Sequence, residues 1–201
     1  MQLSVFCLSS SAVYYINHFT NSMQTVGIYS VAVTLASVVN VFCIALLQYV
    51  QPKLYKLLAQ KKVDHKAIKK LFSQYIISMT LFTILMIGLV PLVYHFLLKQ
   101  TYVQGLQYCY LLCIGHFIWG IAYFFFLWLL YYKEKKKILI LSIIAILVSI
   151  IFNSWLTSNQ GAKGAAIATV ASYATILLIV CFFVKPFIVA MMQNYKPSTI
   201  I

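Results

Sequence analysis

The sequence predicts an all-α integral membrane protein, a six-helix transmembrane bundle that forms a single domain over residues 1–201. First, 63% of the residues are hydrophobic and only 8% are charged, whereas a soluble domain carries about 25% charged residues. Second, the apolar runs 26–50 and 72–98 each hold about 25 residues, which make ~37 Å of helix and cross a ~30 Å hydrocarbon core with some tilt. Third, the lysines gather in the links between such runs.

We expect one helix at each apolar run, and the first of them is short for a full crossing. The approximate bounds are 3–19, 26–50, 72–98, 105–132, 138–156 and 164–184. A proline ring cannot continue a helix interior, so Pro52 is expected to end the second helix and Pro186 the sixth. The polar and small residues 157–163 are typical of a turn between the fifth and sixth helices.

Seven of the fifteen basic residues lie in the link 51–71. They are Lys53, Lys56, Lys61, Lys62, Lys66, Lys69 and Lys70. One lysine at the bilayer centre costs roughly 2.5–3.5 kcal/mol, so this link stays in water. The link 133–137 and the tail 185–201 fall on the same side and raise its total to thirteen lysines. Only Lys99 and Lys163 fall on the other side. The positive-inside rule then makes the lysine-rich side and both termini cytoplasmic.

Composition also excludes several classes of function. The basic residues are all lysines separated by apolar runs, so they do not form the basic face of a nucleic-acid-binding protein. The only carboxylates, Asp64 and Glu134, lie in the lysine-rich links, where they are expected to neutralise local charge. The spans therefore hold no carboxylate relay for protons or sodium, and the chain has no zinc, phosphate-loop or acid–base motif. We predict no enzyme activity and no cofactor.

The five cysteines all fall within apolar runs and form no CxxC pair. Cys109 and Cys113 lie one helical turn apart, a spacing that a metal or redox pair also has. In an apolar helix a cysteine otherwise acts as a small hydrophobic residue. We predict neither a disulfide framework nor a metal site.

Most polar side chains within the spans are expected to hydrogen-bond neighbouring helices or their own backbone. For Asn40, His116 and Asn153 a second interpretation stays open, in which they line a water-filled cavity. His116 has no partner at a ligand spacing and is not predicted to bind metal. Small residues open the second and sixth helices and predict close helix packing. This helix-packing motif comprises Gly27, Tyr29, Gly161, Gly164, Ala165, Ala166 and Thr169.

Three short motifs follow one another along the chain. They are Val26-Gly27-Ile28-Tyr29-Ser30, Pro52 followed by Tyr55-Lys56, and the run 161–169. Their order and spacing resemble those of the Wzx-type polysaccharide flippases, which belong to the multidrug/oligosaccharidyl-lipid/polysaccharide exporter superfamily. The lysine-rich link before the fifth helix and Asn153 near its end also fit. The resemblance covers nearly the whole chain, but only the carboxy-terminal half of such a transporter.

The resemblance implies one lobe of a two-lobed transporter in the bacterial inner (plasma) membrane. Such transporters flip undecaprenyl-diphosphate-linked oligosaccharide for the biosynthesis of O-antigen, and hence lipopolysaccharide, or of capsular polysaccharide. An amino-terminal lobe, missing or encoded separately, would face this one across a central cavity. The chain would then be a truncated or split product, a fragment that does not transport alone. The partners implied are bilayer lipid and the lipid-linked oligosaccharide, with no nucleic acid.

The resemblance also suggests site residues. Candidates for the substrate cavity are Asn17, His18, Asn40, His116 and Asn153. The first two stand where the family often has charged residues, and the spans hold no arginine to pair with a diphosphate. Recognition of that charge is expected to fall to the missing lobe or to interfacial lysines. Those candidates for a lipid headgroup or diphosphate are Lys53, Lys56 and Lys137.

Two other functions remain open. One is the matching lobe of a cation-coupled multidrug exporter from the same superfamily. Such exporters usually hold cationic substrates with an intramembrane carboxylate, and none is present here. The other is a membrane glycan polymerase or transferase, for which His116 is the candidate catalytic group.

Overall fold

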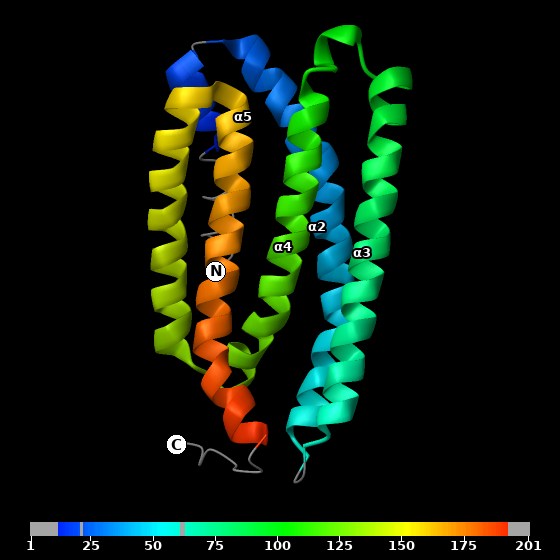
Figure 1. Ribbon diagram of the computed structural model, residues 1–201, viewed down its shortest axis with the longest axis vertical. Helices are drawn as coiled ribbons and strands as arrows, with labels where there is room; N and C mark the ends of the chain where they lie inside the picture. The colour runs from blue at the N-terminus through cyan, green and yellow to red at the C-terminus, as the bar shows by residue number, and fades with distance from the viewer. Residues whose placement is uncertain (1–11, 21, 61–62, 193–201) are drawn as a thin grey trace.

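The computed structural model describes residues 12–20, 22–60 and 63–192, and every regular element among them is helical (Figure 1). Residues 12–20 form a helix. The elements that follow are α2 (Met23–Leu58), α3 (His65–Phe96), the short 3-10 helix η1 (Gln100–Tyr102), α4 (Gly105–Tyr131) and α5 (Lys135–Met192). Of these, α2, α3, α4 and α5 are long and apolar enough to cross a membrane. This agrees with the predicted all-α, multi-pass membrane class.

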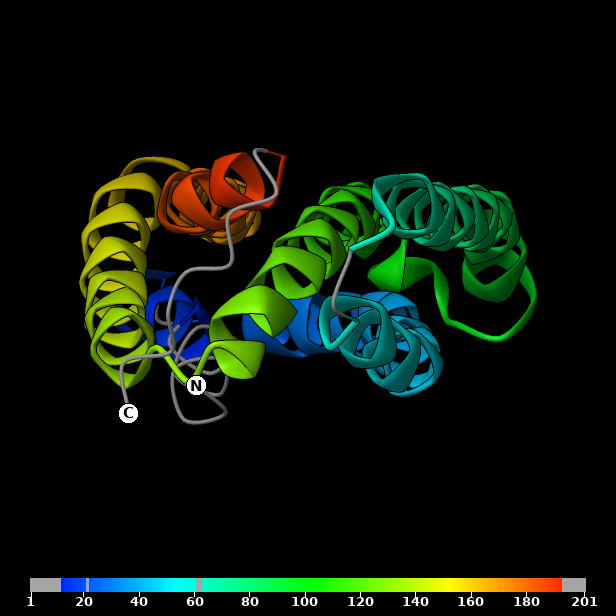
Figure 2. The same cartoon turned by 90° about the horizontal axis from the view of Figure 1, so that it is seen from below.

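The prediction of six separate membrane helices is wrong. The fifth and sixth predicted helices are two arms, 135–160 and 162–192, of the single element α5, which changes direction at Gly161. The two arms stand side by side in Figures 1 and 2. Gly161 has φ of +57° and ψ of −137°, a conformation that only glycine adopts readily. The predicted turn 157–163 is therefore helical except at this residue. Of the predicted first helix, residues 3–11 lie outside the described residues.

Both prolines expected to end a helix lie inside one. The helix α2 continues through Pro52 to Leu58, and α5 continues through Pro186. Proline removes one intrahelical hydrogen bond and frees a carbonyl group. Both prolines are exposed and stand among the lysines of one end of the bundle, where water can donate to the freed carbonyl. Much of the predicted link 51–71 is consequently the water-exposed ends of α2 and α3.

Asp64 begins α3 rather than only neutralising nearby lysines. One oxygen of its carboxylate accepts hydrogen bonds from the backbone N–H groups of Lys66 at 2.9 Å and Ala67 at 3.1 Å. A carboxylate in this position satisfies donors that the first helical turn leaves free. With this cap α3 begins at His65, seven residues after α2 ends at Leu58.

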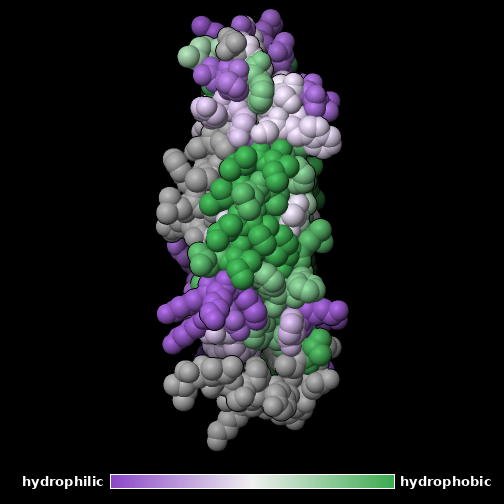
Figure 3. Space-filling view, turned by 90° about the vertical axis from the view of Figure 1, so that its left-hand side faces the viewer, coloured by the Kyte–Doolittle hydropathy of each residue, from purple (hydrophilic) through white to green (hydrophobic). Residues whose placement is uncertain are grey.

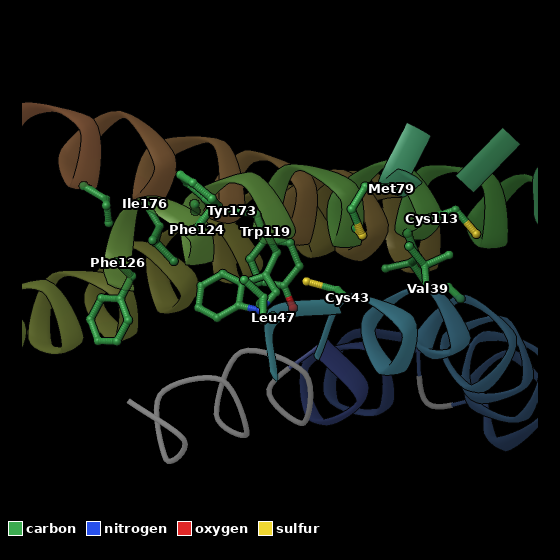
Figure 4. Close-up of a cluster of buried hydrophobic side chains, with 14 of the residues drawn as sticks. Val39, Cys43, Leu47, Met79, Cys113, Trp119, Phe124, Phe126, Tyr173 and Ile176 are labelled. Carbon is green, nitrogen blue, oxygen red and sulfur yellow. The ribbon is translucent and has the colours of Figure 1, made fainter. Parts of the chain in front are cut away.

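The helix α4 lies at the centre of the bundle, with α2 and α3 on one side and the two arms of α5 on the other (Figure 2). Figure 4 shows side chains from all four elements meeting there. Its labelled residues are Val39, Cys43 and Leu47 of α2, Met79 of α3, Cys113, Trp119, Phe124 and Phe126 of α4, and Tyr173 and Ile176 of α5. Because α4 contacts each of the other long helices, its side chains pack against core residues from all of them.

One hydrogen-bonded junction joins α2, α3 and α4. The Tyr75 hydroxyl donates to the backbone oxygen of Gly120 at 2.9 Å and lies 3.3 Å from the Cys43 sulfur. A side chain at position 120 would come within 2.8 Å of the Met79 methyl group. The glycine therefore allows α4 to approach α3 closely, as small residues do between membrane helices.

The lysines are separated along the long axis of the bundle. The α2–α3 link, the α4–α5 link and the end of α5 lie together at one end, and η1 and the Gly161 turn lie at the other (Figure 1). Lys99 caps η1 and Lys163 follows Gly161, so these two lie opposite the remaining described lysines. Figure 3 shows an apolar band between two hydrophilic ends. This pattern matches a bilayer core between two aqueous layers.

Replacing Gly164 by alanine is expected to destabilise the α5 hairpin. A Cβ atom at this position would lie 1.9 Å from the backbone oxygen of Leu156, far inside van der Waals contact, so the two arms would have to separate. The unfolding of purified protein by SDS in mixed micelles, followed by circular dichroism, measures the loss.

Gly27→Ala and Gly88→Ala are the matched controls for this experiment. Neither added methyl group would meet an atom within 4 Å, and both remove a glycine from a helix interior, which raises stability by up to about 1 kcal/mol. If Gly164→Ala proved as stable as these two variants, the close approach of the arms would be wrong.

Candidate functional site

A buried polar seam runs along both arms of α5. We use this name for Ser149, Asn153 and Thr157 of the first arm and Thr169 and Ser172 of the second, all of which are buried. The three residues of the first arm are spaced by four, which places them on one face of the helix. The Asn153 amide donates to the Ser149 carbonyl at 2.9 Å. The Thr169 and Ser172 hydroxyls donate to the carbonyls of Ala165 and Ala168 at 3.0 and 2.7 Å. Most of the seam is thus hydrogen-bonded within its own helix.

Two oxygen atoms of the seam have no hydrogen-bond partner. They are Oδ1 of Asn153 and Oγ1 of Thr157, whose residues are 0% and 1% exposed. A buried polar group without a hydrogen bond costs roughly 2–7 kcal/mol, depending on the reference medium. The Asn153 oxygen can only accept a hydrogen bond, so the seam offers an unused acceptor inside the bundle. Sequence reasoning singled out Asn153 but not Thr157, although their i, i+4 spacing was visible.

A side-chain interaction connects two of the motifs on which the family resemblance rests. The side chains of Tyr29 on α2 and Thr169 on α5 interact. The Thr169 hydroxyl itself donates to the Ala165 carbonyl within α5. Tyr29 is 1% exposed, and its ring lies 6.2 Å from that of Tyr108 on α4.

The residues of the predicted helix-packing motif differ in their surroundings. Ala165 and Ala166 are fully buried, and Gly164 stands against the backbone of the first arm. Gly161 forms the turn itself and lies near Thr20 of the first helix. At Gly27, in contrast, an added side chain would meet no atom within 4 Å. Close packing therefore explains the glycines of α5 but not Gly27.

His116 lies among aromatic rings in the interior. It is 8% exposed, and its ring centroid is 5.9 Å from that of Tyr173 on the second arm of α5. Trp119, one turn later on α4, lies 5.4 Å from the same tyrosine ring. The Nδ1 atom of His116 is buried without a hydrogen-bond partner. No group of three or more His, Cys, Asp or Glu side chains that could hold a metal ion occurs in the described part of the chain.

A second set of polar residues faces away from the core. We call Ser30, Thr34, Ser37 and Gln48 the polar face of α2, because they lie on the side of that helix opposite to its buried residues. The Thr34 hydroxyl donates to the Ser30 carbonyl at 2.9 Å, and the Ser37 hydroxyl donates to the Thr34 carbonyl at 2.6 Å. Asn40 lies at the edge of this face and is half-buried. Its side-chain oxygen is shielded from solvent but has no partner.

The five residues predicted to line a substrate cavity do not form one cluster. Asn17 and His18 are exposed on the first helix, at the end opposite to most lysines, and the His18 ring stacks on that of Tyr14. Asn40, His116 and Asn153 lie on α2, α4 and α5. No hydrogen bond or ring contact between any two of the five occurs within the described ranges. Only Asn40 lies next to an open polar face.

The three lysines predicted to meet a headgroup or diphosphate have different neighbours. Lys137 pairs with Glu134 at 3.3 Å and lies 4.5 Å from the centre of the Phe187 ring. The Lys53 ammonium lies 3.6 Å from the centre of the Tyr49 ring and donates to its hydroxyl. Lys56 is exposed on the last turn of α2. The charge of Lys137 is partly neutralised, so Lys53 and Lys56 are the better-placed cations.

Comparison of the chain with protein-family models, curated proteins and solved structures finds no match. The resemblance to the flippases therefore depends on the short motifs alone, and the function that it implies is argued below as a proposal.

Removing either hydroxyl of the Tyr29–Thr169 pair should weaken the contact between α2 and α5. We expect Tyr29→Phe and Thr169→Val to be coupled in a double-mutant cycle by ~0.6 kcal/mol, and by at most ~1.7 kcal/mol, the range measured for polar pairs between membrane helices. Tyr14→Phe is the control, because Tyr14 is 68% exposed. Unfolding in mixed micelles gives the coupling energy, and strictly additive effects would show that the two hydroxyls do not interact.

Proposed function

We propose that this bundle is one lobe of a flippase for lipid-linked oligosaccharide, working against an opposing lobe. The observation that carries the proposal is the polar face of α2. The Thr34 and Ser37 hydroxyls each donate to a carbonyl of α2, but lipid chains offer no hydrogen-bond partner to the Gln48 carboxamide on this face or to the Asn40 side-chain oxygen at its edge, which has none in the described chain. A water-filled cavity, bounded on its far side by a second lobe, would solvate these groups. Transporters of this general design hold their substrate at such an interface.

The kinds of polar group present favour a glycan as the substrate. The spans carry hydroxyl and carboxamide groups and no carboxylate, since Asp64 and Glu134 both lie at the lysine-rich end. Hydroxyls and carboxamides both donate and accept hydrogen bonds, which suits a sugar rich in hydroxyl groups. Lys53 and Lys56 continue α2 beyond the polar face, where they would meet a diphosphate at the membrane surface.

The two alternative functions have less support. A drug exporter that holds cations with an intramembrane carboxylate would have to take that group from the opposing lobe. A glycan polymerase using His116 would need to bring its substrate into the core, because that residue is 8% exposed and surrounded by Tyr173 and Trp119.

The function is tested by expressing the native locus of this chain in a bacterium that lacks its O-antigen flippase. Restored O-antigen on the cell surface is the expected result, and export of cationic dyes without O-antigen would contradict the proposal. Thr34→Leu should reduce the restored O-antigen severalfold, because it makes the polar face apolar. Val38→Leu is the matched control on the same helix, since Val38 is apolar and 41% exposed.

Labelling with a membrane-impermeant maleimide tests whether water reaches the polar face. In the assembled transporter, Ser37→Cys should react because a thiolate forms only where water is present. Leu81→Cys on α3, a position that is 64% exposed to lipid in this arrangement, should not react. Equal labelling of both cysteines, measured above that of the unsubstituted chain, would remove the basis for a cavity next to α2.

We also propose that the lysine-rich end faces the cytoplasm, in line with the positive-inside rule. Single cysteines in place of Lys66 and Lys135 should then be reached by the impermeant reagent only after bacterial cells are opened. A cysteine in place of Lys163 should be reached in intact cells. Labelling of Lys66→Cys and Lys135→Cys from opposite sides would show that the proposed membrane topology is wrong.

A further inference from the structure

An apolar groove lies between α4 and the second arm of α5. Its volume is about 410 Å³, and it is lined by Phe125, Cys181, Phe182, Lys185, Ile188 and Val189. The five α5 residues are spaced so that they share one helix face. All of the lining side chains are apolar except Lys185, which lies toward the lysine-rich end of the bundle.

The described residues leave this groove open to the bilayer. Phe182 is 73% exposed and Val189 is 42% exposed, although both belong to its lining. Phe125 forms the α4 side, and its ring lies 5.5 Å from that of Phe72 on α3. The Phe125 ring therefore packs against α3 as well as lining the groove. A flexible hydrocarbon chain fits such a space better than a rigid helix does.

Lys185 has no acidic side chain to pair with. The chain contains two carboxylate side chains. Asp64 caps α3, and Glu134 pairs with Lys137 at 3.3 Å. The Lys185 ammonium is therefore free of any acidic side chain and can attract an anion from outside the chain.

We propose that the groove binds one anionic phospholipid of the bilayer, with an acyl chain between α4 and α5 and the headgroup phosphate at Lys185. The volume lies within the range of roughly 300–1,000 Å³ that ligand sites have. Basic pockets between membrane helices at the cytoplasmic side bind anionic headgroups. This site lies on a different surface from the polar face of α2 and does not depend on the flippase function.

Native mass spectrometry of the purified chain, released from mixed micelles, tests the proposal. Phosphatidylglycerol should be retained in preference to phosphatidylcholine with the same acyl chains. Lys185→Gln should reduce that preference by about fivefold, the effect expected of one lysine at a lipid headgroup. Lys135→Gln, at the same end but outside the groove, should leave the preference unchanged.

A second variant separates the acyl chain from the headgroup. Val189→Trp fills the groove from an exposed position and should lower the retention of both lipids while the protein remains folded by circular dichroism. Equal losses in Lys185→Gln and Lys135→Gln would overturn the proposal in favour of diffuse attraction to the lysine-rich end. It would also fail if inorganic phosphate displaced phosphatidylglycerol or if Val189→Trp retained both lipids. Dissociation of a dimer by Val189→Trp would show instead that a second copy of the chain occupies the groove.

Discussion

Membrane helices gain little by exchanging lipid for one another's apolar side chains, so their association depends on close packing and a few hydrogen bonds. In this protein α4 supplies both. Its backbone at Gly120 accepts the Tyr75 hydroxyl and admits the Met79 side chain, and its Gly115 lies against Val170 and Tyr173 of α5. Since α4 contacts α2, α3 and α5, it holds the two sides of the bundle apart. The apolar groove lies on the α5 side of this helix, where Phe125 of α4 completes a lining that α5 otherwise supplies.

The sequence predicts the parts of the fold that depend on local chemistry. Hydropathy places the membrane-crossing segments, and the free energy of burying a lysine places the lysine-rich links. The helix ends predicted at Pro52 and Pro186 are wrong. A proline breaks a helix where each carbonyl must be hydrogen-bonded within the helix itself. Near an aqueous end, water replaces the missing donor and the helix continues. The polar run around Gly161 did indicate a reversal, but the helices extend to within one residue of it.

The site was harder to predict, because the hydrocarbon core of the bilayer and the interior of the protein are both apolar. An apolar residue therefore gives no sign of which side of its helix is buried. Tyr29 and Thr169 were both singled out by sequence, but their contact follows from how α2 and α5 pack. Tyr75 and Gly120 were missed because neither stands out within an apolar run. Asn153 was placed correctly within a span, and only the packing of the arms of α5 shows that it faces inward at 0% exposure.

The two sides of α2 connect the core to the proposed cavity. On one side Tyr29 interacts with Thr169, a residue of the buried polar seam of α5. On the other side lies the polar face, where Thr34 and Gln48 are exposed and Ser30 and Ser37 are half-buried. A helix moves largely as a rigid unit, so in the proposed lobe a displacement of α2 at the cavity would also displace Tyr29 from Thr169. The interaction of α2 with the buried seam and its polar face at the proposed cavity would therefore respond to the same motion.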